Sequence, residues 1–432
     1  MRRLWVLLLV LTACQRPTAE SAKASVEEPA GISTLTAKEV AEDVALLLDV
    51  MRSVHPGYTR YANPENPELL AAHDAAVQAL KDLAGSGAST LSLYQSVSRY
   101  AASLRCDHTK TEYPEAYTEW RRSHPSHLPF RILTDGAEMR VFSAALVSAL
   151  SPGDRIDAFD GIPTPEVISR IGELISVDGY TEHARPHRLE SDSDLMGSAL
   201  DHYLPALFGD RESLPLNVTR LGGGQATVTV PLITFEEWKT LPGPGGTYRA
   251  DFSNAVFLNF PTPGVATLRI DSFVNYRNPM DPEAIYRSVL ANLRGRDVQS
   301  LIIDLRQNGG GSDRPMVELI RALARAPFVP QRPSQVATLD LKRFAPHLGT
   351  WDPRALEPDP SQFRALDTGF YEQIPGPADF HLQELAPAPN AFAGDVILLL
   401  GYSNASGVTH LASKLVDMGR VITVGEPTGG SA

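Results

Sequence analysis

The stretch from residue 396 to residue 410 constrains the fold more than any other, because a buried strand turns there into a helix. Residues 396–400 are five consecutive apolar residues, too few for a long helix and too continuous for a half-exposed strand. They predict a strand buried on both faces. After Gly401 the apolar residues recur at helical spacing, and Gly419 follows as the predicted C-terminal cap.

Ser406 lies in the turn between this strand and this helix. The first N–H groups of a helix have no partner within the helix, and they lie at the positive end of its dipole. An alkoxide or a tetrahedral oxyanion is stabilised at such a place. Serine is also a common helix cap. Position alone therefore leaves two interpretations of Ser406, a nucleophile and a structural cap.

Strands and helices alternate around this stretch in the last part of the chain. The expected elements cover residues 265–270, 282–294, 301–305, 314–323 and 421–424. Such alternation predicts a mostly parallel sheet covered by helices. The proline-dense segment 328–393 interrupts the pattern, and a loop of this length is usually functional or contains small elements of its own.

The 432 residues are too many for one ordinary core, so several domains are expected. Thr36 and Glu39 predict a capping box, followed by helices at residues 40–54, 67–83 and 91–105. From Leu128 the apolar period shortens to that of strands, with helical stretches at 165–175 and 191–207. We therefore expect a helical domain at 36–127, an α+β region at 128–235 and an α/β domain at 236–432.

The first residues are typical of a targeting segment. Arg2 and Arg3 precede a short apolar run, and residues 11–14 (Leu-Thr-Ala-Cys) resemble the lipobox of bacterial lipoproteins. This resemblance implies a signal peptide at 1–13, lipidation of Cys14 and a tether at 14–35. With Gln15 after the cysteine, it implies a periplasm-facing location at the outer membrane of a bacterial cell envelope. A secretory peptide cleaved after Ala13 is the alternative.

Two further motifs carry chemistry. Residues 301–311 predict a buried strand that ends in three consecutive glycines, which let backbone N–H groups face a cavity; a tight turn is the alternative. Asp107-His108 follows the third predicted helix. Since a serine hydroxyl needs a base to react, His108 is a candidate base, although a structural histidine at a helix end is equally compatible with the sequence.

These motifs together resemble the S41 peptidases, the family of tail-specific and C-terminal processing proteases, the tricorn core protease and the interphotoreceptor retinoid-binding protein modules. The resemblance covers about residues 36–432. The family's "DgHt" is matched at 107–109, its "GDxI…idG" at 153–161, its "LIIDLRxNgGG" at 301–311, and its nucleophile motif with "GExTgG" at 404–430.

The resemblance implies an N-terminal helical domain, a PDZ-like α+β region and a crotonase/ClpP-like α/β catalytic domain. It makes Ser406 the nucleophile, with the N–H of Gly407 and one from Gly309 or Gly310 as the oxyanion hole. Ser431 stands where the Ser-Lys branch has its lysine, so the resemblance implies the Ser-His branch with His108 as base. Relatives continue beyond the position of Ala432 with strands and an orienting glutamate, so we expect a catalytic domain truncated at its C-terminus.

The expected function is therefore serine endopeptidase activity by acyl transfer on periplasmic or unfolded proteins. A catalytically inactive peptide-binding lipoprotein on the same fold is the alternative. The net charge of −12 argues against a nucleic-acid partner. We expect no cofactor and no metal, because Pro186 breaks the helix that a zinc pair at His183 and His187 would need.

Overall fold

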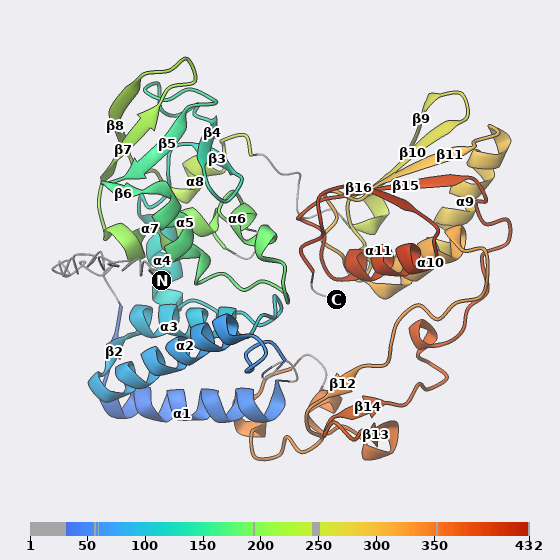
Figure 1. Cartoon of the computed structure of the whole chain (residues 1–432), viewed down its shortest axis with the longest axis horizontal. Coiled ribbons are helices and arrows are strands. Elements are labelled where there is room, and N and C mark those ends of the chain that lie inside the picture. The colour runs from blue at the N-terminus through green and yellow to red at the C-terminus, as the bar shows by residue number, and fades with distance from the viewer. Residues whose placement is uncertain are drawn as a thin grey trace, which may run out of the picture.

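The computed structural model describes residues 32–55, 58, 60–192, 195–243, 251–350 and 353–430 (Figure 1). The predicted signal peptide, Cys14 and Ser431 lie outside these residues. Within them the chain is mixed α/β, with several sheets and helices packed into separate hydrophobic cores. None of the described helices is long and apolar enough to cross a bilayer.

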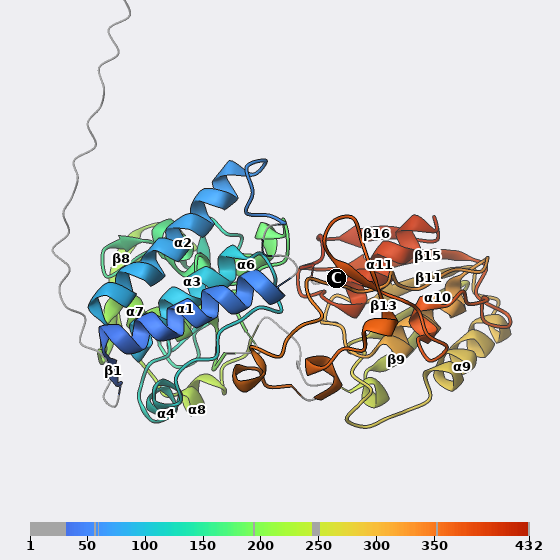
Figure 2. The ribbon, with the colours of Figure 1, turned by 90° about the horizontal axis from the view of Figure 1, so that it is seen from below.

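Three helices near the N-terminus lie side by side (Figure 2). They are α1 (Ala37–Val54), α2 (Pro67–Ser86) and α3 (Thr90–Ser103), as the apolar spacing predicts. The capping box at the start of α1 is confirmed, since Thr36 and Glu39 each accept a hydrogen bond from the other's backbone N–H. Short strands β1 (Thr34–Leu35) and β2 (Ala88–Ser89) pair beside them.

The following region contains an antiparallel sheet with the order β3-β4-β5-β7-β8. Its strands are β3 (Arg131–Thr134), β4 (Met139–Ser143), β5 (Arg155–Phe159), β7 (Ser213–Thr219) and β8 (Gln225–Pro231), and β6 (Ile162–Pro163) pairs with β5. The helices are α4 (Glu115–Ser123), α5 (Thr164–Gly172), α6 (Arg185–Arg188), α7 (Ala199–Phe208) and α8 (Phe235–Trp238). Residues of α3 and α4 enter the core of this sheet, so the helical part and the sheet are joined by packing.

The helical stretch predicted from residue 191 begins later, at Ala199. Gly197 has a φ of 104°, which interrupts the helical path, and the Ser198 side chain then accepts a hydrogen bond from the N–H of Asp201 as a cap. Helix α4 was not predicted from the sequence.

The second large sheet has the order β16-β15-β11-β10-β9 (Figure 1). Its strands are β9 (Val256–Thr262), β10 (Val265–Ile270), β11 (Ser300–Asp304), β15 (Asp395–Leu400) and β16 (Ile422–Gly425), and its helices are α9 (Pro282–Gly295), α10 (Asp313–Leu323) and α11 (Gly407–Asp417). The pairings from β10 to β16 are parallel, which confirms the predicted parallel sheet. Strand β9, which was not predicted, adds an antiparallel hairpin.

Strand β15 differs in burial from the prediction. Val396, Leu398 and Leu400 are buried, whereas Ile397 and Leu399 on the other face are only partly buried. Helix α11 ends as expected, with Gly419 just after its cap at a φ of 59°.

The proline-dense segment forms a small antiparallel sheet of its own, with the order β12-β14-β13. Its strands are β12 (Gln335–Val336), β13 (Phe363–Ala365) and β14 (Tyr371–Gln373). The 3₁₀ turns among the described residues are η1 (Glu182–Ala184), η2 (Phe252–Asn254), η3 (Ala345–His347), η4 (Pro353–Leu356), η5 (Pro360–Gln362) and η6 (Phe380–Leu382). Arg343 of this segment donates hydrogen bonds to Asp49 and Ser53 of α1, at 3.1 and 2.7 Å, and so connects it to the helical part.

Candidate active site

Ser406 has a backbone conformation that L-residues seldom adopt. It caps helix α11 with φ 49° and ψ −125°, and a residue held in such a region costs about 1–3 kcal/mol. The surrounding chain maintains this conformation by hydrogen bonds. The Ser406 N–H donates to the carbonyl of Gly430 at 3.2 Å, and the Ser406 carbonyl accepts from the N–H of Thr409 at 2.9 Å.

Gly310 packs directly against this turn. A Cβ at Gly310 would lie 2.8 Å from the carbonyl oxygen of Ala405 and 2.9 Å from the Cβ of Ser406. Its φ of 103° also favours glycine. The glycine run after β11 is therefore needed here for close approach to the serine turn, in addition to any hydrogen bonds that it donates.

Two buried asparagines join the β11 and β15 loops beneath Ser406. Asn404 and Asn308 are both 0% exposed. The Asn404 amide nitrogen donates to the carbonyls of Leu305 and Asn308, and its oxygen accepts from the Gly401 N–H at 2.8 Å. The sequence motifs predict no role for either residue. Since buried polar groups require partners, the network fixes the relative position of the two loops.

The candidate oxyanion donors differ in their hydrogen bonding. Gly407 is the first residue of α11, so its N–H has no acceptor within the helix. The Gly310 N–H, in contrast, donates to the side-chain oxygen of Asn308 at 2.8 Å. Within the described residues, the N–H groups of Gly309 and Gly311 donate to no backbone carbonyl or side chain. The N–H of Gly310 is therefore already used within the protein, whereas those of Gly309 and Gly311 are available to a ligand.

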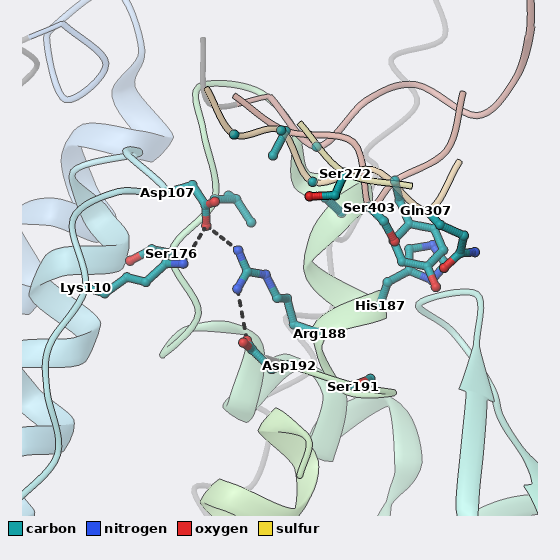
Figure 3. A pocket seen from close by; sticks show the side chains of 18 of the residues that line it. Asp107, Lys110, Ser176, His187, Arg188, Ser191, Asp192, Ser272, Gln307 and Ser403 are labelled. Carbon is teal, nitrogen blue, oxygen red and sulfur yellow. Dashed lines mark hydrogen bonds and ion pairs between the residues drawn. The ribbon is translucent and has the colours of Figure 1, made fainter. Parts of the chain in front are cut away.

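A cavity of about 310 Å³ lies between the two halves of the protein beside this turn (Figure 3). The backbone of the glycine run, Ser403 and Ala405 line one side. Asp107, Lys110 and Arg188 line the other, and Figure 3 shows them grouped together across from Ser403. The cavity is therefore built jointly by the helical part, the first sheet region and the second sheet region.

Neither His108 nor Ser406 is among the residues that line the cavity. His108 is an exposed residue of the turn after α3, and its near neighbours Asp107 and Lys110 line the cavity. The structure thus brings Ser406, Gly407 and Gly310 into direct contact. Sequence neighbours of His108 and of Ser406 line the same cavity, and the assignment of His108 as the base stays a prediction.

The His108 turn is held by a segment that we call the bridging segment, residues 176–192. Arg188 donates one hydrogen bond to Asp107 and another, of 3.0 Å, to Asp192 (Figure 3). The Ser176 hydroxyl donates to the carbonyl of Thr109 at 2.8 Å. These contacts link residues about 70 to 80 positions apart in the sequence, so no local pattern could have revealed them.

The bridging segment also contacts the serine side of the cavity. The His183 Nε2–H donates to the carbonyl of Thr428 at 3.0 Å. The His187 ring stacks on the Tyr402 ring, with 3.5 Å between centroids and 6° between planes. The Nδ1 of His187 lies 3.3 Å from a carboxylate oxygen of the buried Glu190. The bridging segment therefore contacts both the turn that contains His108 and the chain around the turn that contains Ser406.

Burial shifts the pKa of two groups near the serine turn and the cavity. Burial lowers the pKa of His410 on α11, although nearby Asp313 opposes the shift. Burial also raises the pKa of the cavity-lining Asp271, although nearby Arg269 opposes the shift. In the part of the chain that the structure describes, no group of three or more His, Cys, Asp or Glu side chains is arranged to hold a metal ion.

Comparisons with known proteins agree with the arrangement of the second sheet. The model of the family described as Peptidase family S41 matches residues 264–432. A search of curated proteins finds no match. Among solved structures, mature CPAF complexed with lactacystin aligns over 92% of this chain and 85% of its own, with 15% identity and a TM-score of 0.57. Mature CPAF without that compound aligns over 91% and 84%, with 14% identity and a TM-score of 0.57. At this identity the alignments show a shared fold.

Proposed function

Residues 264–432 belong to peptidase family S41, and on this premise we propose that the protein is a serine endopeptidase that cleaves unfolded or envelope proteins by acyl transfer. The observation that carries the proposal is the Ser406 turn. A serine with a strained backbone, placed before a free helix N–H and against a glycine run, has the geometry expected of an exposed nucleophile.

The reaction uses groups from both sides of the cavity. The Ser406 hydroxyl oxygen attacks the scissile carbonyl carbon, and His108 accepts the hydroxyl proton. The negative charge that forms on the carbonyl oxygen is stabilised by the N–H of Gly407 together with that of Gly309 or Gly311. His108 then gives the proton to the leaving amine. Water, activated by the same histidine, hydrolyses the acyl-enzyme.

The nucleophile is tested with a fluorophosphonate probe, which reacts with activated serines. Wild-type protein should be labelled and Ser406→Ala should not. Ser403→Ala is the matched control, because Ser403 lies three residues before Ser406 and lines the neighbouring cavity. This variant should be labelled as the wild type is. If a folded wild-type protein binds unfolded substrate but is never labelled at Ser406, the peptide-binding alternative replaces the peptidase proposal.

The base is tested separately. His108→Ala should lower kcat/KM by roughly 10²- to 10⁴-fold, the usual effect of losing a general base. His347→Ala, at an exposed residue of the proline-dense segment, is the control and should leave kcat/KM unchanged. Full activity in His108→Ala would exclude it as the base.

We also propose that Cys14 is lipidated and attaches the protein to the bacterial envelope, with the catalytic part facing the periplasm. The support is the Leu-Thr-Ala-Cys sequence after a short apolar run. Radiolabelled palmitate should enter the wild type but not Cys14→Ala. Equal labelling of both proteins would exclude the anchor.

A further inference from the structure

A histidine that the proposed reaction does not use lies in the wall of the cavity. His187 of α6 lines the cavity together with Tyr402 and Ser403. Figure 3 shows His187 near Ser403 and across the cavity from Asp107. Because an imidazole can both donate and accept hydrogen bonds, the bonding of its two nitrogens decides what the ring offers to a ligand.

Two contacts fix the orientation of the His187 ring. Its face stacks on the Tyr402 ring, with 3.5 Å between centroids and 6° between planes. Its Nδ1 lies 3.3 Å from Oε1 of Glu190, whose side chain is almost fully buried. The stack sets the plane of the ring, and the Nδ1 contact sets which edge of the ring points away from Glu190.

The contact with Glu190 also decides which nitrogen carries the hydrogen. Oε1 of Glu190 accepts a further hydrogen bond from the Thr134 N–H at 2.8 Å, and Oε2 accepts one from the Tyr402 hydroxyl at 3.3 Å. A carboxylate has no hydrogen to donate, so the hydrogen of the His187 contact belongs to Nδ1. In the neutral imidazole the other nitrogen, Nε2, is then a hydrogen-bond acceptor.

The Nε2 of His187 is exposed in the cavity wall. It makes no hydrogen bond to any residue that the structure describes, and it is not among the buried polar atoms that lack a partner. Other acceptors in the wall are already in use. The Gly310 carbonyl accepts the Phe273 N–H, and the Ser272 hydroxyl oxygen accepts the Val274 N–H, both at 3.0 Å.

A peptide enclosed in this cavity needs donors for its carbonyl oxygens and acceptors for its N–H groups. The glycine run supplies donors, because among the described residues the N–H groups of Gly309 and Gly311 donate to no carbonyl or side chain. His187 supplies an acceptor in the same wall. Since its orientation is fixed by the contacts with Tyr402 and Glu190, little freedom of the ring is lost when a peptide binds.

We propose that the Nε2 of His187 accepts a hydrogen bond from one backbone N–H of the substrate peptide. This inference deepens the proposed peptidase function and rests on it. Every residue except proline has a backbone N–H, so the contact positions the chain without selecting a side chain. It also excludes proline from one position of the substrate, where the N–H is required.

The contact is tested by methylating the backbone nitrogens of a peptide one at a time, at pH 8, where an ordinary imidazole is neutral. Ser406→Ala, which cannot form the acyl-enzyme, should bind the peptide about 3- to 10-fold more weakly when one particular nitrogen is methylated, the usual effect of losing one hydrogen bond. Proline at that position should weaken binding as well. Methylation of every nitrogen without a loss of affinity would overturn the proposal.

A second substitution shows whether His187 is the partner. In Ser406→Ala/His187→Phe, a ring still packs against Tyr402 but has no nitrogen, so methylation at the sensitive position should cause no further loss. Ser406→Ala/His347→Phe, changed at an exposed residue of the proline-dense segment, is the control and should keep the full methylation effect. An equal methylation effect in both double variants would exclude His187 as the acceptor.

Nitrogen NMR of the imidazoles tests the contact without any change at residue 187. In Ser406→Ala the Nε2 signal of His187 should shift when the peptide is added. It should stay in place when the peptide methylated at the sensitive position is added at a concentration that saturates binding. An unmoved signal with the unmethylated peptide would overturn the proposal even if His187→Phe failed to fold.

These measurements separate the inference from the peptidase proposal. If the wild type cleaves nothing but the methylation pattern and the Nε2 shift are found, the His187 contact stands and the peptidase proposal falls. If the wild type cleaves peptides and the methylation effect is the same without the imidazole, the peptidase proposal stands and the His187 contact falls. Failure of Ser406→Ala to bind any peptide would also overturn the contact.

Discussion

The backbone of Ser406 has a measurable energetic consequence. Its φ of 49° is disfavoured for serine and for alanine but is accessible to glycine. We therefore predict that Ser406→Gly unfolds with a free energy about 1 kcal/mol higher than Ser406→Ala, since only the glycine relieves the strain. Urea denaturation of the two variants measures the difference. Equal stabilities would mean that the turn is not strained in solution.

Buried His127 gives a prediction about pH. Burial and the nearby Arg121, which donates a hydrogen bond of 2.8 Å to its Nε2, lower the pKa of His127 to about 3. In the unfolded chain its pKa is near 6.5. Below that pH the His127 imidazole binds a proton in the unfolded state but not in the folded state. His127 therefore lowers the free energy of unfolding as the pH falls from about 6.5 towards 3, by up to about 1.4 kcal/mol per pH unit.

The free energy of unfolding, measured by urea denaturation between pH 7 and 4.5, should decline less steeply in His127→Gln than in the wild type. His347→Gln at an exposed site should keep the wild-type slope. Identical slopes in all three proteins would show that folding does not lower the pKa of His127.

Local sequence patterns predicted which residues form the serine turn, but they did not predict the hydrogen bonds and ion pairs around it. Ser406 and Gly310 follow from a strand that ends in a turn and from consecutive glycines. The Asn308 side-chain oxygen accepts a hydrogen bond from the N–H of Gly310. This hydrogen bond depends on the rotamer of Asn308, which no sequence motif encodes. The pairing of Asp107 with Arg188 is also invisible in the sequence, because it depends on how separate elements pack.

At the level of elements, the bridging segment connects the two sides of the site. His187→Ala would remove both the ring that stacks on Tyr402 and the contact with Glu190. We predict faster amide hydrogen exchange at residues 402–410 in this variant, because the serine turn loses support from one side. Tyr402→Phe keeps the stacked ring and should exchange nearly as the wild type does. Unchanged exchange in His187→Ala would show that the stack does not restrain the turn.

Elements with a clear repeat or cap were predictable, and those defined by packing were not. Helix α1 has a capping box and regular apolar spacing, and strands β10, β11 and β15 are continuous apolar runs, so the sequence alone predicts them. Helix α4 is short, and it buries Arg121 along with Tyr117 and Trp120. A buried arginine looks like a surface residue in the sequence, and this explains why the helix was missed.

At the scale of the molecule, the two large sheets have separate cores. Leu216 lies in the first core and Leu398 in the second, and both are 0% exposed. Either residue changed to alanine should lower stability by about 2–5 kcal/mol. Leu398→Ala should increase hydrogen exchange mainly in β10, β11 and β15, and Leu216→Ala mainly in β5, β7 and β8. A uniform increase across both sheets in either variant would show that the cores unfold as one unit.

The hydrogen bond between His183 and Thr428 joins residues 245 positions apart, and the Gly430 carbonyl holds the N–H of Ser406. During synthesis the serine therefore reaches its strained conformation only after residue 430 has left the ribosome and returned to the segment made much earlier. Contacts of such long range form late in folding. We therefore expect Ser406 to lack this backbone conformation in nascent chains that end before residue 430.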